Sequence, residues 1–175
     1  MSLSVTERGR RIATFRFVAV RLMETAAAWT PTTPEMEVKV LLGRHIWDFA
    51  QHADALGRRT FELRLPAQHS QPPGEAYLAV LDEVRGLPGT AERLAALYDV
   101  VLPGLDRRLA DYAREADLIV DEPSLLIVER IRTDVARQRA DAGRVRDELG
   151  LPVPPLPLLR AREEAAAVLG AGAPA

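Results

Sequence analysis

The sequence predicts an all-α fold in which four long helices pack as an antiparallel bundle. Apolar residues recur with the helical period over four long segments, whereas no alternating strand pattern of convincing length and no internal repeat occurs. Prolines and glycines gather between these segments, where they end one helix and begin the next. At 175 residues, the chain is about the size of one domain and is long enough to bury a sizeable core.

The first half of the chain is expected to form two long helices. One runs over residues 5–29 and ends at Thr30-Pro31. The other runs over residues 34–65, with Pro34 at its first helical position, and ends before Pro66. Proline is accepted at a helix start because its missing N–H has no partner there in any case.

The second half supplies a short helix and two more long ones. A polar loop over 67–74 precedes a short helix over 75–84. A long helix then covers 90–116, and Pro103-Gly104 in its middle is expected to kink it. The last long helix, over 121–149, is expected to face inward with an apolar stripe, while its charge run is interpreted as a solvated face.

The chain divides into two parts by composition. Residues 1–150 are expected to form the helical bundle. Residues 151–175 are expected to form a proline-rich connector, a short amphipathic helix over 158–169 and a flexible tail.

Composition excludes several classes of function. The net charge of -2, with 47% hydrophobic and 27% charged residues, is ordinary for a soluble protein and favours neither nucleic acid nor an anionic membrane. The chain has no cysteine, which excludes disulfides, thiolate metal sites and cysteine nucleophiles. No apolar run resembles a secretion signal or a membrane span, so a cytoplasmic location is expected.

The most informative polar residues are His45, Asp48 and His52, which stand three and four residues apart within an apolar stretch. Helical spacing puts them on one face with Leu41 and Leu56, and that face should point inward. Ionisable groups are costly to bury unless they pair, bind a metal or act on a ligand. We therefore expect the functional site at this trio.

Two runs, EVKVLLGRHIWDFAQHADALGRRTFELR (37–64) and LYDVVLPGLDRRLADY…DEPSLLIVERIRTDVARQ (within 97–138), resemble the ferritin-like superfamily. The likeness is to small bacterial members whose last bundle helix opens with an Asp-Glu-Pro-Thr type phrase. It implies a ferritin-like four-helix bundle with a short extra helix between the second and third. In the di-iron members, two helices each supply a Glu and the other two each supply a Glu-x-x-His.

The metal ligands that this resemblance implies are mostly missing. Glu24 could stand for the first carboxylate, and His52 fits the histidine of the second helix, but Phe49 stands three residues before it. The third helix has no carboxylate on its core stripe. In the last helix the Glu-x-x-His positions hold Val135 and Gln138. We therefore expect a degenerate di-iron site.

Our main hypothesis is a small-molecule tailoring enzyme that works without a cofactor, with its substrate in the volume that metals fill in the relatives. A histidine beside a buried aspartate can act as a general acid or base near neutral pH. Cyclisation, dehydration or isomerisation would suit such a site, and natural-product biosynthesis is one setting. The expected catalytic residues are His45, Asp48 and His52, followed by Glu24, Tyr98 and Tyr112.

Two alternatives remain. Iron or another divalent metal could be held by His52, Asp48, His45 and Glu24, which would make the protein an iron-dependent oxidase or oxygenase. Otherwise the trio is a satisfied polar network in a non-catalytic binding or accessory protein. Besides a small-molecule substrate, a homodimer stays open as a partner, because Trp47 lies away from the histidine face and could cover a second copy or a neighbouring helix.

Overall fold

The computed structural model describes residues 3–167, and over that range the chain contains helices and loops but no strand. The all-α prediction is therefore confirmed. In chain order the elements are α1 (Val5–Trp29), the 3₁₀ turn η1 (Thr30–Thr32), α2 (Met36–Glu62), α3 (Glu75–Arg85), α4 (Thr90–Ala95), the π-helical segment η2 (Ala96–Val101), α5 (Leu102–Glu115), α6 (Glu122–Leu149) and α7 (Pro157–Ala165).

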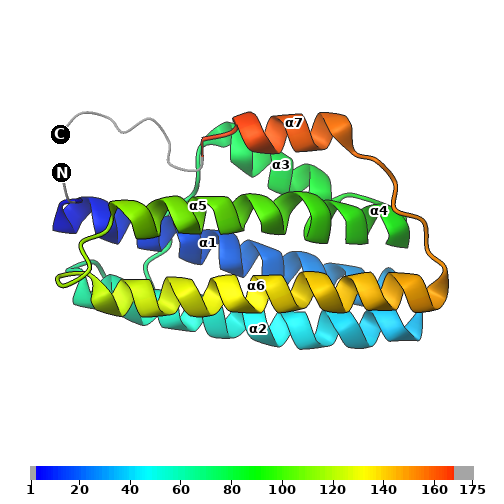
Figure 1. Cartoon of the computed structure of the whole chain (residues 1–175), viewed down its shortest axis with the longest axis horizontal. Coiled ribbons are helices and arrows are strands. Elements are labelled where there is room, and N and C mark those ends of the chain that lie inside the picture. The colour runs from blue at the N-terminus through cyan, green and yellow to red at the C-terminus, as the bar shows by residue number, and fades with distance from the viewer. Residues whose placement is uncertain (1–2, 168–175) are drawn as a thin grey trace.

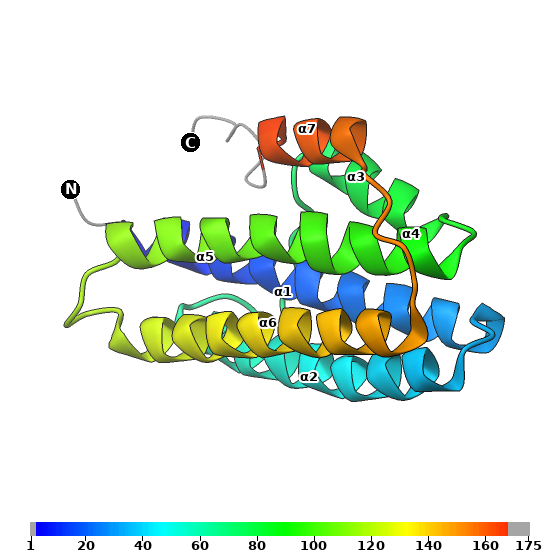
Figure 2. The same ribbon diagram turned by 45° about the vertical axis from the view of Figure 1, so that its right-hand side comes forward.

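Four long helical segments lie side by side: α1, α2, α6 and the continuous run from α4 through η2 to α5 (Figures 1 and 2). In Figure 1, α1 and α6 run from left to right, whereas α2 and the α4–α5 run go from right to left. The chain between α2 and α4 returns along the bundle and includes α3. The short helices α3 and α7 pack against each other on one side of the four long segments.

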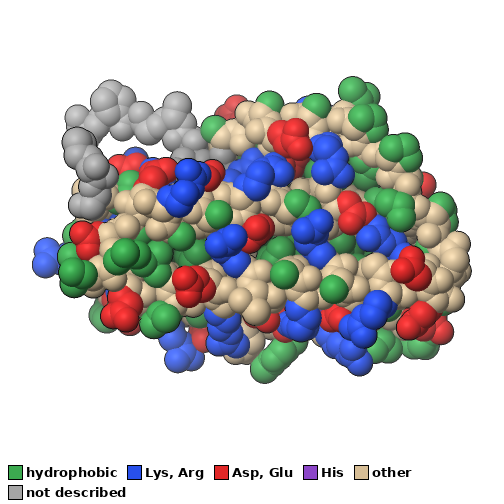
Figure 3. Space-filling view, viewed as in Figure 1, with side chains coloured by type: hydrophobic (Ala, Val, Ile, Leu, Met, Phe, Trp, Pro, Cys, Tyr) green, Lys and Arg blue, Asp and Glu red, His purple; other side chains and the backbone are tan. Residues whose placement is uncertain are grey.

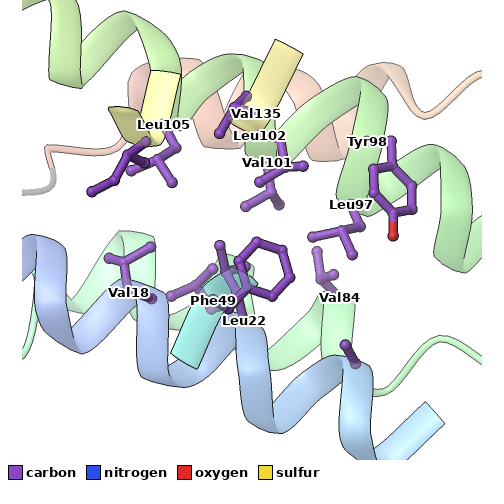
Figure 4. Close-up of a cluster of buried hydrophobic side chains, with 14 of the residues drawn as sticks. Val18, Leu22, Phe49, Val84, Leu97, Tyr98, Val101, Leu102, Leu105 and Val135 are labelled. Carbon is purple, nitrogen blue, oxygen red and sulfur yellow. The ribbon is translucent and has the colours of Figure 1, made fainter. Parts of the chain in front are cut away.

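The core lies between the four long segments and is built from aliphatic and aromatic side chains. Figure 4 shows Val18 and Leu22 of α1 and Phe49 of α2 facing Leu105 of α5 and Val135 of α6. All five side chains are buried, as the inward stripes in the sequence predict. The second and last helices therefore present the expected faces to the core.

Most expected helix boundaries are confirmed, with two corrections in α2. The helix begins at Met36 rather than Pro34, because Thr33 and Glu35 have extended backbone conformations. It ends at Glu62 rather than Leu65, and Arg64 beyond it has a positive φ of 66°. The end of α6 is as expected, since Gly150 takes the left-handed conformation that commonly closes a helix.

The kink expected at Pro103 takes another form. Residues Ala96–Val101, just before it, are π-helical. Proline has no N–H, and its ring clashes with the carbonyl four residues earlier, so the backbone widens ahead of Pro103. The carbonyl of Tyr98 accepts a hydrogen bond of 3.0 Å from Nε of Arg139 on α6. The widened turn is thus tied to the neighbouring helix.

The segment that follows α6 is docked onto the rest of the chain. The connector leads to α7, which ends at Ala165 rather than at residue 169. Glu163 of α7 is fully buried and pairs with Arg107 and Arg108 of α5. The predicted flexible tail and the last residues of the predicted short helix, 168–175, lie outside the described residues. Within residues 3–167, no helix is both long and apolar enough to cross a membrane.

Candidate functional site between α2 and α6

The predicted trio lies on α2 where this helix packs against α6, and each member faces a polar partner across the contact. Since the two helices run in opposite directions, seven residues forward on α2 correspond to seven residues back on α6. The pairs across the contact are His45 with Asp141, Asp48 with Gln138, and His52 with Asp134.

His52 and Asp134 form the closest of these pairs. Nε2 of His52 lies 2.9 Å from Oδ2 of Asp134, and the His52 side chain is almost completely buried. Burial lowers the pKa of His52, although the hydrogen bond and charge of Asp134 act in the opposite direction. Burial also acts to raise the pKa of Asp134, but hydrogen bonds from His52 and Arg137 outweigh it and keep this pKa below its usual value. The pair is therefore a neutral imidazole beside an ionised carboxylate at neutral pH.

This pairing fixes the tautomer of His52. An ionised carboxylate only accepts hydrogen bonds, so Nε2 carries the proton and donates it to Asp134. Nδ1 is then left with a free lone pair. It has no hydrogen-bond partner in the part of the chain that the structure describes, and it is not among the fully buried unpartnered atoms. Nδ1 is thus available to accept a proton from outside the helix contact.

A groove on the surface between α2 and α6 leads to His52. It has a volume of about 220 Å³ and is mostly apolar, with Ala55, Leu126 and Ile127 among its lining residues. Arg130 brings one positive charge to the groove. A small molecule, or one end of a larger one, could therefore reach His52 from the surface.

The interior of the bundle offers far less space. On its inner side His52 borders an apolar cavity of about 10 Å³, enclosed by residues such as Phe15, Phe49 and Leu105. A cavity of that size has room for one water molecule at most. Within residues 3–167, the bundle centre therefore leaves no substrate-sized space beside His52, and the open space next to His52 is the surface groove.

His45 is paired with Tyr98 of the π-helical segment η2. Its Nδ1 lies 2.7 Å from the Tyr98 hydroxyl, and both side chains are fully buried. Burial lowers the pKa of His45 to about 4 and raises the pKa of Tyr98. Nε2 of His45 is 3.8 Å from Asp141, which is too far for a hydrogen bond, and has no partner among the described residues.

Asp48 does not pair with the two histidines that were expected to flank it. Its side chain is only partly buried, and its Oδ2 accepts hydrogen bonds from Arg137 at 2.8 Å and from Gln138 at 3.1 Å. It makes no hydrogen bond to His45 or His52, because it points across to α6 between them. Arg137 also binds Asp134 at 3.1 Å, so it links Asp48 to the carboxylate that pairs with His52.

Two expected site residues lie elsewhere. Glu24 is exposed on the surface, where it pairs with Arg21 at 3.5 Å and Arg85 at 3.7 Å. Tyr112 donates a hydrogen bond to the buried Asp121, which also binds Arg59. Tyr112 and Tyr98 stand on the same helical run but fourteen residues apart, or about 21 Å along the helix. The corrected site therefore excludes Glu24 and Tyr112.

The residues present do not fit a di-iron centre. Val135 and Gln138 occupy the positions at which the ferritin-like pattern has ligands on the last helix, and both are buried. Across residues 3–167, no three histidine, aspartate or glutamate side chains come together in a way that could hold a metal ion.

The sequence reasoning missed the contribution of α6. Asp134, Arg137 and Asp141 belong to the charge run interpreted as a solvated face, yet they supply the partners of α2. A signal was present: Asp134, Gln138 and Asp141 are spaced by four and three residues, the mirror image of the trio on α2. Antiparallel helices bring such mirrored spacings together.

Comparisons of the chain with protein-family models, curated proteins and solved structures give no match.

Proposed function

We propose that this protein is a small-molecule tailoring enzyme in which His52 is the general base. The observation that carries the proposal is the 2.9 Å contact between Nε2 of His52 and Asp134 beside a surface groove. A carboxylate that fixes the tautomer of a histidine, with the opposite nitrogen free, is the arrangement that acid–base catalysis requires.

The chemistry would proceed by moving one proton. Nδ1 of His52 removes a proton from a carbon or hydroxyl of the bound molecule, and Asp134 stabilises the imidazolium that forms. Arg130 is placed to stabilise negative charge that develops on the substrate. The imidazolium then returns the proton to another atom of the same molecule, which completes an isomerisation or cyclisation. If the imidazolium instead delivers the proton to a departing hydroxyl, the reaction is a dehydration and water is the second product.

The other predicted residues would then act as positioning groups. Arg137 holds Asp134 in place and is itself bound by Asp48. His45 and Tyr98 tie α2 to the π-helical segment one layer away, and π-helical turns are frequent near functional sites. Asp48, His45 and Tyr98 do not line the groove that reaches His52.

We further propose that the fold is a ferritin-like antiparallel bundle whose metal site has been lost. The support is the path of the chain, in which one long crossover containing α3 joins α2 to α4 and leaves these helices pointing the same way. A bundle with one such crossover is characteristic of ferritin-like folds. The residues at the lost metal site are now apolar or amide-bearing, as the buried Val135 and Gln138 illustrate.

The enzyme proposal is tested by turnover of a small-molecule extract. The wild-type protein is incubated with metabolites from the source cells, and mass spectrometry follows which compounds are consumed and formed. His52→Gln and Asp134→Asn should each slow the conversion by about a hundredfold or more, because general acid–base groups contribute about that much. Glu24→Gln, an exposed acid outside the site, is the matched control and should retain full turnover.

Two results would contradict the proposal. If His52→Gln lowers stability but leaves the conversion intact, the histidine pair is structural and the protein is a binding or accessory protein. If protein purified with added iron carries about one tightly bound metal ion per chain, and His52→Ala loses it, the iron-dependent alternative is correct.

A further inference from the structure

A strip of apolar side chains runs along the face of α2 that points away from the bundle. Met36, Val40, Trp47 and Phe61 are each more than half exposed, and Trp47 is 66% exposed. Gly43 lies between them, and a Cβ added there would meet nothing within 4 Å. In Figure 3 hydrophobic side chains project from the lower edge of the molecule, where α2 lies in Figure 1. Met36, Val40, Gly43 and Trp47 have no covering element among the described residues, whereas Gly57, nearer the end of the helix, is buried beneath Gln68 of the following loop.

The strip has the spacing of a coiled-coil seam. Successive positions in the strip are alternately four and three residues apart. Two helices that share this repeat can stay in contact along their length. The seam positions are Met36, Val40, Gly43, Trp47, Ala50, Asp54, Gly57 and Phe61. The positions along one flank are Glu37, Arg44, Gln51 and Arg58.

We propose that a second copy of this chain binds this strip, with the two α2 helices antiparallel about a twofold axis. In that register Trp47 packs against Ala50 of the partner subunit, so the largest seam residue meets a small one. Met36 packs against Phe61 of the partner subunit at each end. Such a contact is self-complementary, as a twofold interface must be.

The charges on the flank select this orientation. With the helices antiparallel, Glu37 faces Arg58 of the partner subunit, and the twofold axis repeats this ion pair at the other end. A parallel pair would instead put these two flanks on opposite sides of the seam, so that Glu37 and Arg58 of the partner subunit would not face each other. Arg58 is free to change partners, because its present pair with Asp54 is exposed to solvent. Charge complementarity therefore favours a second copy in the antiparallel arrangement.

This interface is independent of the proposed activity. The seam lies on the outer side of α2, whereas His52 and Asp134 face α6. The groove that reaches His52 is lined by Gln51 and Ala55 on its α2 side, at the edge of the seam. The dimer can therefore form, or fail to form, whether or not His52 acts as a base.

The first test measures the mass of the protein in solution over a concentration series by analytical ultracentrifugation. We expect a dimer whose dissociation constant rises about thirtyfold or more in Trp47→Glu, as for an aromatic residue at the centre of an interface. Leu158→Glu replaces an equally exposed apolar residue on α7 and is the matched control that should leave the dimer intact. Circular dichroism confirms that each variant folds. A monomeric wild type at all concentrations, or an equal effect of Leu158→Glu, would overturn the proposal.

The second test exchanges the charges. Glu37→Arg and Arg58→Glu should each weaken the dimer, because each places like charges together at both ends of the seam. The double variant Glu37→Arg with Arg58→Glu restores opposite charges and should recover most of the lost affinity. Recovery supports the antiparallel register, whereas a double variant weaker than both single variants contradicts it.

Discussion

At the scale of single residues, the two histidines of α2 lie in different surroundings despite their similar burial. His45 is fully buried and bonded to Tyr98. His52 sits between α6 and the surface groove, and Asp134 fixes its tautomer. The position of each on α2 follows from the sequence, but their partners depend on which residues η2 and α6 present.

His45 should make the protein less stable in acid. Burial lowers the pKa of His45 from 6.5 to about 4 in the folded state, so below pH 6.5 the unfolded chain binds more protons than the folded one. The free energy of unfolding should therefore fall as the pH drops from 6.5 to 4, by about 3 kcal/mol in total. Urea unfolding at several pH values measures this slope.

Two variants separate the contribution of His45 from that of other histidines. The His45→Gln variant should lose the larger part of the dependence of the free energy of unfolding on pH, whatever the stability of this variant at pH 7. His69→Gln removes the histidine of the loop between α2 and α3 and should leave the slope unchanged. An unchanged slope in His45→Gln would show that another group causes the acid sensitivity.

Asp134 should oppose the decrease in the pKa of His52 that burial causes. Its hydrogen bond and its charge are the largest influences that oppose the effect of burial. Asp134→Asn should therefore lower the pKa of His52 further, which NMR titration of the imidazole protons measures. Asp54→Asn, on the exposed side of α2, is the control. A higher pKa of His52 in Asp134→Asn would mean that the two side chains do not interact in solution.

At the scale of elements, the sequence located every long helix but could not show how α7 is held. The apolar period and the prolines mark each helix, while the short C-terminal one carries no sign of its docking site. Glu163 is buried against Gly104 of α5, where any side chain would meet its carboxylate. Arg107 and Arg108 neutralise Glu163 there. Whether an acid on this mostly polar helix becomes buried depends on how the helix packs against α5, not on its local sequence.

Glu163→Ala should release α7 from the bundle. The substitution leaves Arg108 without its carboxylate partner and removes the contact over Gly104, and breaking a buried pair by removing one member costs about 3 kcal/mol or more. Trypsin should then cut after Arg160 and Arg162 at least about tenfold faster, because local release lets the backbone around these already exposed side chains unfold into the protease. The Glu164→Ala variant, which is changed at the exposed neighbouring position, should be cleaved at the wild-type rate. Equal cleavage of both variants would show that apolar contacts alone hold α7.

At the scale of the whole molecule, one end of the bundle is joined by a buried polar cluster centred on Asp121. Arg59 of α2 binds Asp121 at 3.1 Å, and Tyr112 of α5 donates a hydrogen bond to the same carboxylate. Ser124 of α6 donates to it at 2.6 Å. Nη1 of Arg8 on α1 lies 3.8 Å from Asp121, so all four long segments meet at this residue, which the sequence presents only as the start of the last long helix.

Asp121→Ala should therefore destabilise the entire fold. Without the carboxylate, Arg59 keeps a buried positive charge, and such a loss costs about 3 to 5 kcal/mol. Denaturant unfolding should show a lower midpoint in a single transition, because the cluster joins helices rather than fixing one loop. Asp117→Ala, in the loop between α5 and α6, is the nearby control and should cost far less. A second transition would show that the helices unfold separately.

The sequence by itself determined the all-α class, the helix positions and the inward face of α2 that carries His45, Asp48 and His52. These depend on local periodicity and on proline and glycine, which act over a few residues. Only the tertiary structure decided that Asp134, Arg137 and Asp141 of α6 are their partners, that Glu24 and Tyr112 lie elsewhere, and that the accessible space is a surface groove. Those outcomes depend on the register between helices distant in the chain, which local spacing does not fix.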